Sequence, residues 1–287
     1  MERPTYPQTH TPGYRITEGG TVKRKRHLHP FLLLVLILWW GGIAGAVDRN
    51  NLTFYLPFEG SYAPKIAPAT TEIKLKDFIL PDMGVFKSLS DDNRRYLEPD
   101  DKSPRKLEFV PGRRGLGLKV SGNPTRFKVY SYPCVQYVAR ECFAPKEGTI
   151  AFWMKPAGWS GDKAHRYYLA VTADNCTMRF YSFPGGTYVW LDAKNMYRLI
   201  STDTSWSGWK DGEWTLLTFT YKPGQQCFYV NGQLMTKSTD GLIEPEFVNK
   251  GLIEISEGDQ VVDELMVFNQ PLTPLEAAAL YRANAIH

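Results

Sequence analysis

The sequence predicts an all-β domain, a sandwich of two antiparallel sheets with one short helix near the C-terminal end. Three observations lead to this fold class. Short stretches of alternating apolar and polar residues recur between Leu52 and Phe268, as expected for half-buried strands. Turns rich in Gly, Pro and Asn separate these stretches, and one stretch, at 273–284, is marked as a helix. Frequent short strands with little helix favour a sandwich over an α/β fold.

The N-terminal segment is basic. Residues 1–30 hold six of the 34 Lys and Arg residues but two of the 30 acidic residues, and they include the block Lys23-Arg24-Lys25-Arg26. Residues 31–287 hold 28 residues of each sign. The net charge of +4 is therefore a property of the tail, and the rest of the chain gives no electrostatic case for nucleic acid as a partner.

The apolar run 31–47 has two interpretations. As a signal peptide it would follow a long basic n-region and end at Ala44-Gly45-Ala46, which fits the rule for cleavage sites. As a membrane anchor its 17 residues are at the short limit for crossing the hydrocarbon, with residues 1–30 as a cytoplasmic tail. Both interpretations place residues 48–287 outside the cytoplasmic membrane, either secreted or anchored, because the basic block precedes the run.

The first strand is expected where Leu52, Phe54, Leu56 and Phe58 alternate. Residues 60–105 are irregular, and we expect an insertion with one or two minor strands there, around the apolar island at 78–80. Further strands are expected at 106–110, 115–120, 126–132, 149–155, 166–173, 176–182, 187–191, 197–201, 214–221, 225–231, 251–256 and 261–268.

Turn motifs and a helix-capping motif occur in the C-terminal part of the sequence. Pro223-Gly224 separates two expected strands, and Asn231-Gly232 supplies the positive φ angles that a tight hairpin needs. Thr273-Pro274-Leu275-Glu276 reads as a capping box, with Thr273 as N-cap and Pro274 at the first helical position. The short helix that follows must dock on the sandwich to be stable.

The order of several segments resembles the laminin-G-like jelly-roll domains of the concanavalin A-like superfamily. The segments are Phe58-Glu59-Gly60, Phe109-Val110-Pro111-Gly112, Gly115-Leu116-Gly117-Leu118, Gly148–Pro156, Trp209 to Tyr221, Phe228–Gly232 and Asp263-Glu264. The resemblance implies one jelly-roll domain over residues 48–287. It also implies a binding module more often than an enzyme, although this scaffold carries many functions.

Two acids are candidate metal ligands. In the expected strand 261–268, Asp263 and Glu264 face opposite sides, so one carboxylate must approach the core and needs hydrogen bonds or a cation. Relatives of this fold often hold calcium between the end of the first strand and this late acid, which here implies Glu59 and Asp263. Backbone carbonyls and water would have to complete the calcium shell. The alternative is that Asp263 accepts loop amides and Glu59 is solvated.

Aromatic residues are the candidate ligand contacts. Trp159, Trp206 and Trp209 lie in loop-like sequence rich in Gly and Ser, and exposed aromatic rings suit the stacking of sugars. Trp153 and Trp214 lie within strand patterns and are expected in the core.

The four cysteines lie in the part of the chain that is expected to be exported, where thiols oxidise. Cys134 and Cys142 are close in sequence and are expected to bridge a local loop. Cys176 and Cys227 would then join two strand regions. The alternative is four buried free thiols, and no cysteine spacing suggests zinc.

Catalysis has little support in the sequence. Retaining glycosidases on related jelly-rolls place acids at every second residue of one strand, with the two carboxylates about 5 Å apart, and no such run occurs here. We therefore expect a non-catalytic module that binds an extracellular glycan or a protein partner. The alternative is a polysaccharide-active hydrolase with unrecognised acids.

Overall fold

The computed structural model describes residues 47–81, 95–97, 106–121, 129–160, 166–183, 186–202, 208–256 and 259–283. The chain divides into a unit Met1–Ile43 and a unit Ala44–His287, and the described residues all belong to the second. The basic tail, the apolar run up to Ala46 and Trp206 lie outside them. Within these ranges no helix has the length and apolar character needed to span a membrane.

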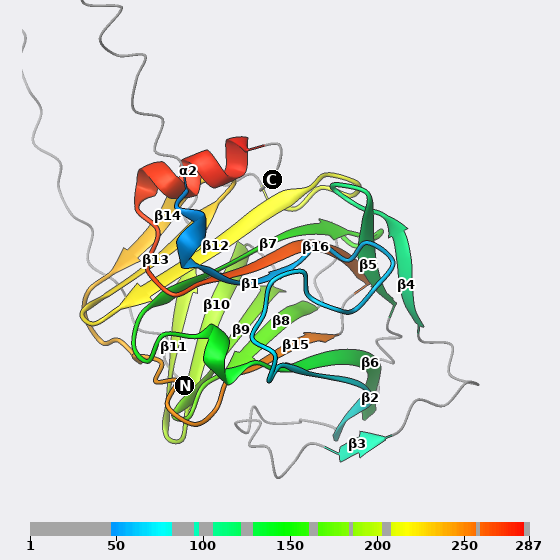
Figure 1. The fold of residues 1–287 in the computed structure, drawn as a ribbon, viewed down its shortest axis with the longest axis horizontal. Coiled ribbons are helices and arrows are strands. Elements are labelled where there is room, and N and C mark those ends of the chain that lie inside the picture. The colour runs from blue at the N-terminus through cyan, green and yellow to red at the C-terminus, as the bar shows by residue number, and fades with distance from the viewer. Residues whose placement is uncertain are drawn as a thin grey trace, which may run out of the picture. The chain divides into compact units, whose positions relative to one another are not determined.

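The second unit contains two sheets, and every pairing between its described strands is antiparallel (Figure 1). Sheet A runs in the order β14 (Gln233–Ser238), β13 (Gln225–Val230), β12 (Thr215–Lys222), β7 (Gly148–Pro156), β16 (Gln260–Phe268), β5 (Leu116–Ser121) and β4 (Lys106–Pro111), and β1 (Leu52–Leu56) also pairs with β16. Sheet B runs in the order β11 (Met196–Ser201), β10 (Gly186–Ala193), β9 (Cys176–Phe183), β8 (Arg166–Thr172), β15 (Leu252–Ser256), β6 (Val129–Val138), β2 (Glu72–Pro81) and β3 (Arg95–Leu97). The all-β prediction is confirmed.

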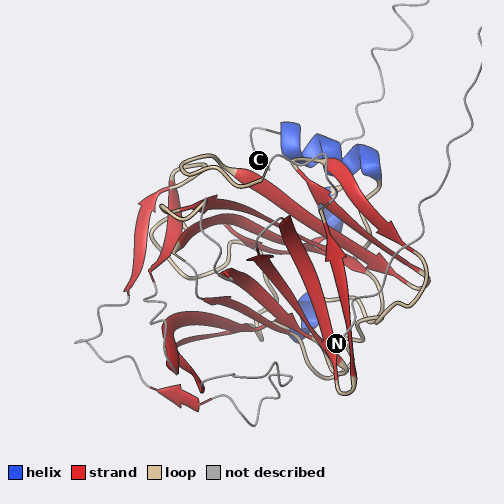
Figure 2. Ribbon diagram, turned by 180° about the vertical axis from the view of Figure 1, so that it is seen from behind, coloured by secondary structure: helices blue, strands red, loops and turns tan. Residues whose placement is uncertain are grey.

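Helical structure is a minor part of the described chain. Two short 3-10 turns, Arg49–Asn51 and Arg140–Cys142, flank strands. Helix α2 (Pro274–Arg282) has the predicted capping box: Thr273 caps the amide of Glu276, and the Glu276 carboxylate accepts from the Thr273 amide. Figures 1 and 2 show α2 on the side of sheet A that faces away from sheet B. Its docking agrees with the expectation that so short a helix needs the sandwich.

The main core lies between the two sheets. Alternate residues of each strand point into it, such as Phe152 of β7 and Phe180 of β9, whose rings meet edge to face with centroids 5.1 Å apart. A smaller cluster lies on the outer side of sheet A beneath α2, and there Trp153 is buried as predicted, with Trp214 half-buried beside it. Asn231 and Gly232 form the turn between β13 and β14 with positive φ angles of 51° and 75°, as the hairpin requires.

The described residues of the segment 60–105 are more regular than the sequence suggested. Strand β2 has ten residues and pairs with β6 along its whole length, from Glu72 opposite Val138 to Pro81 opposite Val129. Its regular pairing with β6 outweighs the weak local pattern of this charged stretch, because the ladder hydrogen bonds do not depend on side chains. The other minor strand is β3, and residues 82–94 and 98–105 lie outside the described residues.

The two predicted disulfides are absent, and all four cysteines are buried thiols in the structure. Cys176 lies in the core between the sheets, whereas Cys227 lies on the other side of sheet A against Ala277 of α2. Cys142 also lies in the main core. Cys134 is the neighbour of Val135 in β6, and Val135 points into that core. Neighbouring side chains of a strand face opposite sides, so Cys134 faces the other side of sheet B. Each expected pair is therefore divided between the two faces of a sheet.

Candidate functional site

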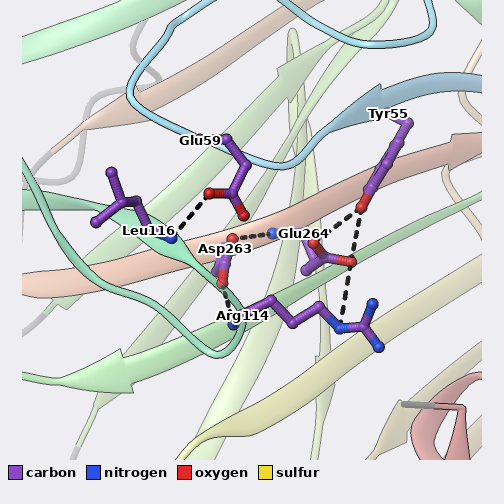
Figure 3. A network of polar contacts seen from close by, with 6 residues as sticks. All are labelled: Tyr55, Glu59, Arg114, Leu116, Asp263 and Glu264. Carbon is purple, nitrogen blue, oxygen red and sulfur yellow. Dashed lines mark hydrogen bonds and ion pairs between the residues drawn. The ribbon is translucent and has the colours of Figure 1, made fainter. Parts of the chain in front are cut away.

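Two regions of the described chain gather side chains that carry chemistry. The first lies where β16 meets the turn between β4 and β5 and is rich in acids (Figure 3). The second is a group of aromatic rings on the outer face of sheet B.

The acidic region depends on an irregularity in β16. The register of β16 against β7 shifts between Asp263 and Met266, and Glu264 has a positive φ of 51°. In a regular strand these neighbouring acids would face opposite sides, but here both are buried, with 0% of Asp263 and 4% of Glu264 exposed. The sequence predicted one carboxylate near the core, and the irregular backbone buries two.

Asp263 is held by backbone amides. Its Oδ2 accepts from the N–H of Arg114 at 3.0 Å and its Oδ1 from the N–H of Glu264 at 2.8 Å. Burial raises the pKa of Asp263 to about 7, and the charge of Glu264 adds to this effect, while the amides oppose it. The backbone amides therefore do not fully replace the lost hydration of this carboxylate.

Glu264 is held by side chains. The hydroxyl of Tyr55 on β1 lies 2.9 and 3.0 Å from its two oxygens, and Nε of Arg114 lies 4.0 Å from Oε2. Burial raises the pKa of Glu264; the hydrogen bond from Tyr55 and the charge of Arg114 lower it, and the charge of Glu59 raises it. Burial, followed by the charge of Glu264 and its hydrogen bond, holds the pKa of Tyr55 above its usual range.

Glu59 joins this region through the turn 111–116. Its Oε2 accepts from the N–H of Leu116 at 3.2 Å. The turn passes so close to the acids that a Cβ on Gly112 would lie 2.6 Å from Oδ2 of Asp263. A Cβ on Gly115, which has a positive φ of 38°, would collide with the Glu59 carboxylate. The structure thus brings the predicted pair Glu59 and Asp263 to one turn, together with Glu264, which was not predicted as a site residue.

These acids meet some requirements of a calcium site. Their oxygens are hard ligands, and each oxygen that accepts one amide keeps a second lone pair. Their charges also repel one another, which a bound cation would relieve. Across the described ranges no three acidic, histidine or cysteine side chains form a metal-binding group. Glu59 and Asp263 would therefore hold calcium only with backbone carbonyls and water as further ligands.

Two of the three predicted tryptophans, Trp159 and Trp209, lie among the described residues, and both rings pack against other side chains. Trp159 is 6% exposed, and its ring stacks on Tyr168 with centroids 6.1 Å apart. Its Nε1 donates to the backbone oxygen of Asp259 at 2.8 Å, and the Arg166 guanidinium lies 5.6 Å from the ring centroid. Trp209 meets the same rings edge to face and packs against the main core. These contacts leave no free ring face on Trp159 for a sugar.

A different set of aromatic residues lies on the outer face of sheet B. We call it the aromatic row, and its members are Tyr167 on β8, Tyr181 on β9, Tyr188 and Trp190 on β10, and Tyr197 on β11. Phe180 and Val189, which alternate with these residues, point into the core. The row therefore faces away from sheet A.

The rings of the row contact one another across the strands. Tyr181 stacks on Tyr167 and on Tyr188, with centroids 5.4 and 5.2 Å apart. Trp190 lies 6.0 Å from Tyr181 and meets Tyr197 edge to face at 6.4 Å. Tyr181 is buried beneath its neighbours, whereas Tyr197 is 69% exposed. The contacts make a continuous aromatic surface over four adjacent strands.

An ion pair supports the centre of the row. Nη1 of Arg179 lies 3.0 Å from Oδ2 of Asp192, and both side chains are buried or nearly so. The same guanidinium lies 5.5 Å from the centroid of the Trp190 ring. Sequence reasoning missed the row, although Tyr188-Val189-Trp190-Leu191 alternates core and aromatic residues.

Comparison with known proteins supports the fold. Residues 134–278 match the family model described as the concanavalin A-like lectin/glucanases superfamily. The chain belongs to this superfamily. The resemblance drawn from the sequence is thereby confirmed, and the concanavalin A-like jelly-roll agrees with the two antiparallel sheets. No curated protein matches the sequence.

Solved structures of this fold are similar at low sequence identity. Domain 4 of AbnA, a GH43 extracellular arabinanase from Geobacillus stearothermophilus, in complex with arabinotriose, has a TM-score of 0.55 and 16% identity, over 80% of this chain and 98% of that one. The binding domain of Paraclostridial Mosquitocidal Protein 1 has a TM-score of 0.56 and 17% identity, over 81% and 52%. The botulinum neurotoxin serotype D binding domain has a TM-score of 0.56 and 13% identity, over 82% and 52%. At these identities the likeness concerns the fold.

Proposed function

We propose that this member of the concanavalin A-like superfamily is a non-catalytic recognition module that binds a glycan or a protein partner. The observation that carries the proposal is the aromatic row. Tyr and Trp side chains present a rigid apolar face with a polar edge, which suits ligands that are themselves partly polar. A continuous aromatic surface over four strands is more than the scattered exposed rings of an ordinary protein surface.

The arrangement of acids supports binding rather than hydrolysis. Glycosidases need two carboxylates about 5 to 9.5 Å apart. On the outer face of sheet B, Glu254 on β15 and Asp192 on β10 are separated by three strand spacings, which is roughly 14 Å. Glu254 also accepts a hydrogen bond from Gln136, and Asp192 is paired with Arg179. Asp263 and Glu264 are buried behind the turn 111–116.

Similar structures add support of a general kind. One was solved with arabinotriose, and another comes from botulinum neurotoxin type C, whose cell entry depends on interaction with two ganglioside molecules. These ligands belong to those proteins. These similar structures support the proposal because domains of this fold occur in proteins that interact with sugars or gangliosides.

We also propose that the domain works outside the cytoplasmic membrane, either secreted or anchored through residues 31–47. The basic block before that apolar run supports this orientation. N-terminal sequencing of the mature protein separates the two forms, because a start at Val47 means cleavage and an intact Met1 means an anchor.

The function is tested with the full-length chain in mild detergent. A glycan array and a parallel assay for new reducing ends should show retention of at least one glycan and no turnover. Turnover of any polysaccharide would replace the proposal by the hydrolase. An array without signal would direct the search to protein partners.

A further inference from the structure

The aromatic row runs across the strands rather than along one of them. Tyr167, Tyr181 and Tyr188 are direct partners in the ladders that join β8, β9 and β10. Trp190 lies opposite Leu199 on β11, and Tyr197 lies opposite Asp192. From β8 to β11 there are three strand spacings, which is roughly 14 Å. A single sugar ring cannot contact Tyr167 and Tyr197 together.

The row carries no charge of its own. Its five members are four tyrosines and one tryptophan, and burial raises the pKa of Tyr181 to about 12. The cation beneath it, Arg179, is matched by Asp192 at 3.0 Å. A ligand that carries carboxylates or sulfates would gain no new ion pair from these residues, while its charges would lose hydration.

The ion pair fixes the central ring. Asp192 holds the guanidinium of Arg179, which in turn lies against the Trp190 ring. A ring that is already oriented loses little conformational freedom when a ligand stacks on it. Tyr197 is the most exposed member and lies at the outer end of the row, so it contacts only a ligand long enough to reach it.

We propose that the aromatic row binds an extended, neutral glycan chain that crosses strands β8 to β11, with Trp190 near its centre and Tyr197 at one end. This inference rests on the proposed function and adds the class of ligand and its direction. Arg179 and Asp192 act as positioning residues for Trp190 and do not recognise a charge on the ligand.

The test combines ligand length with position in the row. The full-length chain in detergent is titrated calorimetrically with arabino-, xylo- and cello-oligosaccharides of two to six units, and with galacturonic acid oligosaccharides of the same lengths. Affinity for one neutral series should rise with length and then level off. Tyr197→Ala should weaken the longest member about tenfold, equivalent to about 1.4 kcal/mol, and leave the dimer unchanged. Tyr197→Phe, which keeps the ring, should bind like the wild type.

Three results would overturn the inference. The first is equal affinity for dimers and hexamers, or an equal effect of Tyr197→Ala on both, which would mean a compact ligand. The second is stronger binding of the galacturonic acid series, which would mean a charged ligand. The third is a glycan array that shows binding although none of the arabino-, xylo- and cello-oligosaccharides binds in the titrations. In each case the recognition function would stand, whereas an array without any glycan signal would remove this inference and the glycan form of the proposed function, leaving a protein partner as the ligand to test. Circular dichroism should confirm that the Tyr197 variants fold, since this side chain is mostly exposed.

Discussion

The hydroxyl of Tyr55 donates to the carboxylate of Glu264, and the oxygens lie 2.9 and 3.0 Å apart. The contact joins β1 to β16, whose backbones also pair. Tyr55 thus provides a hydrogen bond to an acid that is 4% exposed, and a buried carboxylate without donors is costly.

Removing this hydroxyl should destabilise the domain. Tyr55→Phe should lower the free energy of unfolding by about 1–3 kcal/mol, because Glu264 keeps its burial and loses a donor. Urea denaturation measures the change. Tyr197→Phe, at an exposed tyrosine, is the matched control and should have no effect. Equal stability of Tyr55→Phe and wild type would show that Glu264 does not depend on this contact.

The turn 111–116, which passes close to Glu59 and Asp263, should require glycine at Gly112. A Cβ there would lie 2.5 Å from the backbone oxygen of Arg114 and 2.6 Å from Oδ2 of Asp263. We expect Gly112→Ala to cost about 1–3 kcal/mol, since the backbone must shift. Gly158→Ala is the control: its φ of 91° is also unfavourable for alanine, but a Cβ there meets no atom within 4 Å. The prediction fails if the thermal midpoint of Gly112→Ala is not the lower of the two.

Asp263 should make stability depend on pH in metal-free buffer. Its pKa rises from an ordinary 3.8 to about 7 on folding, so between these values the folded state binds more protons than the unfolded state. Stability should therefore fall as pH rises through that window, by roughly a few kcal/mol, and level off above it. Urea denaturation at pH 5 and pH 8 with chelator should show this slope in the wild type and a smaller slope in Asp263→Asn. Equal slopes would assign the dependence to other groups.

Calcium should stabilise the wild type if Glu59 and Asp263 share a cation, as the resemblance to relatives of this fold implies. Binding to the folded state alone raises stability by about 2.7 kcal/mol at one hundred times Kd. Melting curves with calcium should lie above those with chelator for the wild type and should coincide for Asp263→Asn. Coincident curves for the wild type would leave Asp263 as an acceptor of the Arg114 and Glu264 amides and remove calcium from the account.

Strands and turns with a strong local pattern were predictable from the sequence. The alternation in 214–221, the Asn231-Gly232 turn and the capping box at Thr273 each depend on residues close in the chain, and each is confirmed. Strand β2 was underestimated because its order comes from pairing with β6, far along the chain. The paired positions are not visible in a local pattern.

The sites were less predictable because they depend on faces and register. Strict alternation predicts that Asp263 and Glu264 point apart, and the register shift in β16 buries both. The expected pairing of Cys176 with Cys227 fails because sheet A lies between them. Loop-like sequence around Trp159 suggested exposure, yet tertiary contacts bury it, while Trp190 lies in a strand and contributes to an outer surface.

The most direct test of the central claim compares wild type, Trp190→Ala and Trp190→Phe on the same glycan array, with folding checked by circular dichroism. If the aromatic row is the recognition surface, the wild type retains a glycan without turnover, folded Trp190→Ala loses most of that signal and Trp190→Phe keeps part of it. Full retention of the glycan by folded Trp190→Ala would contradict the account and place recognition elsewhere on the domain.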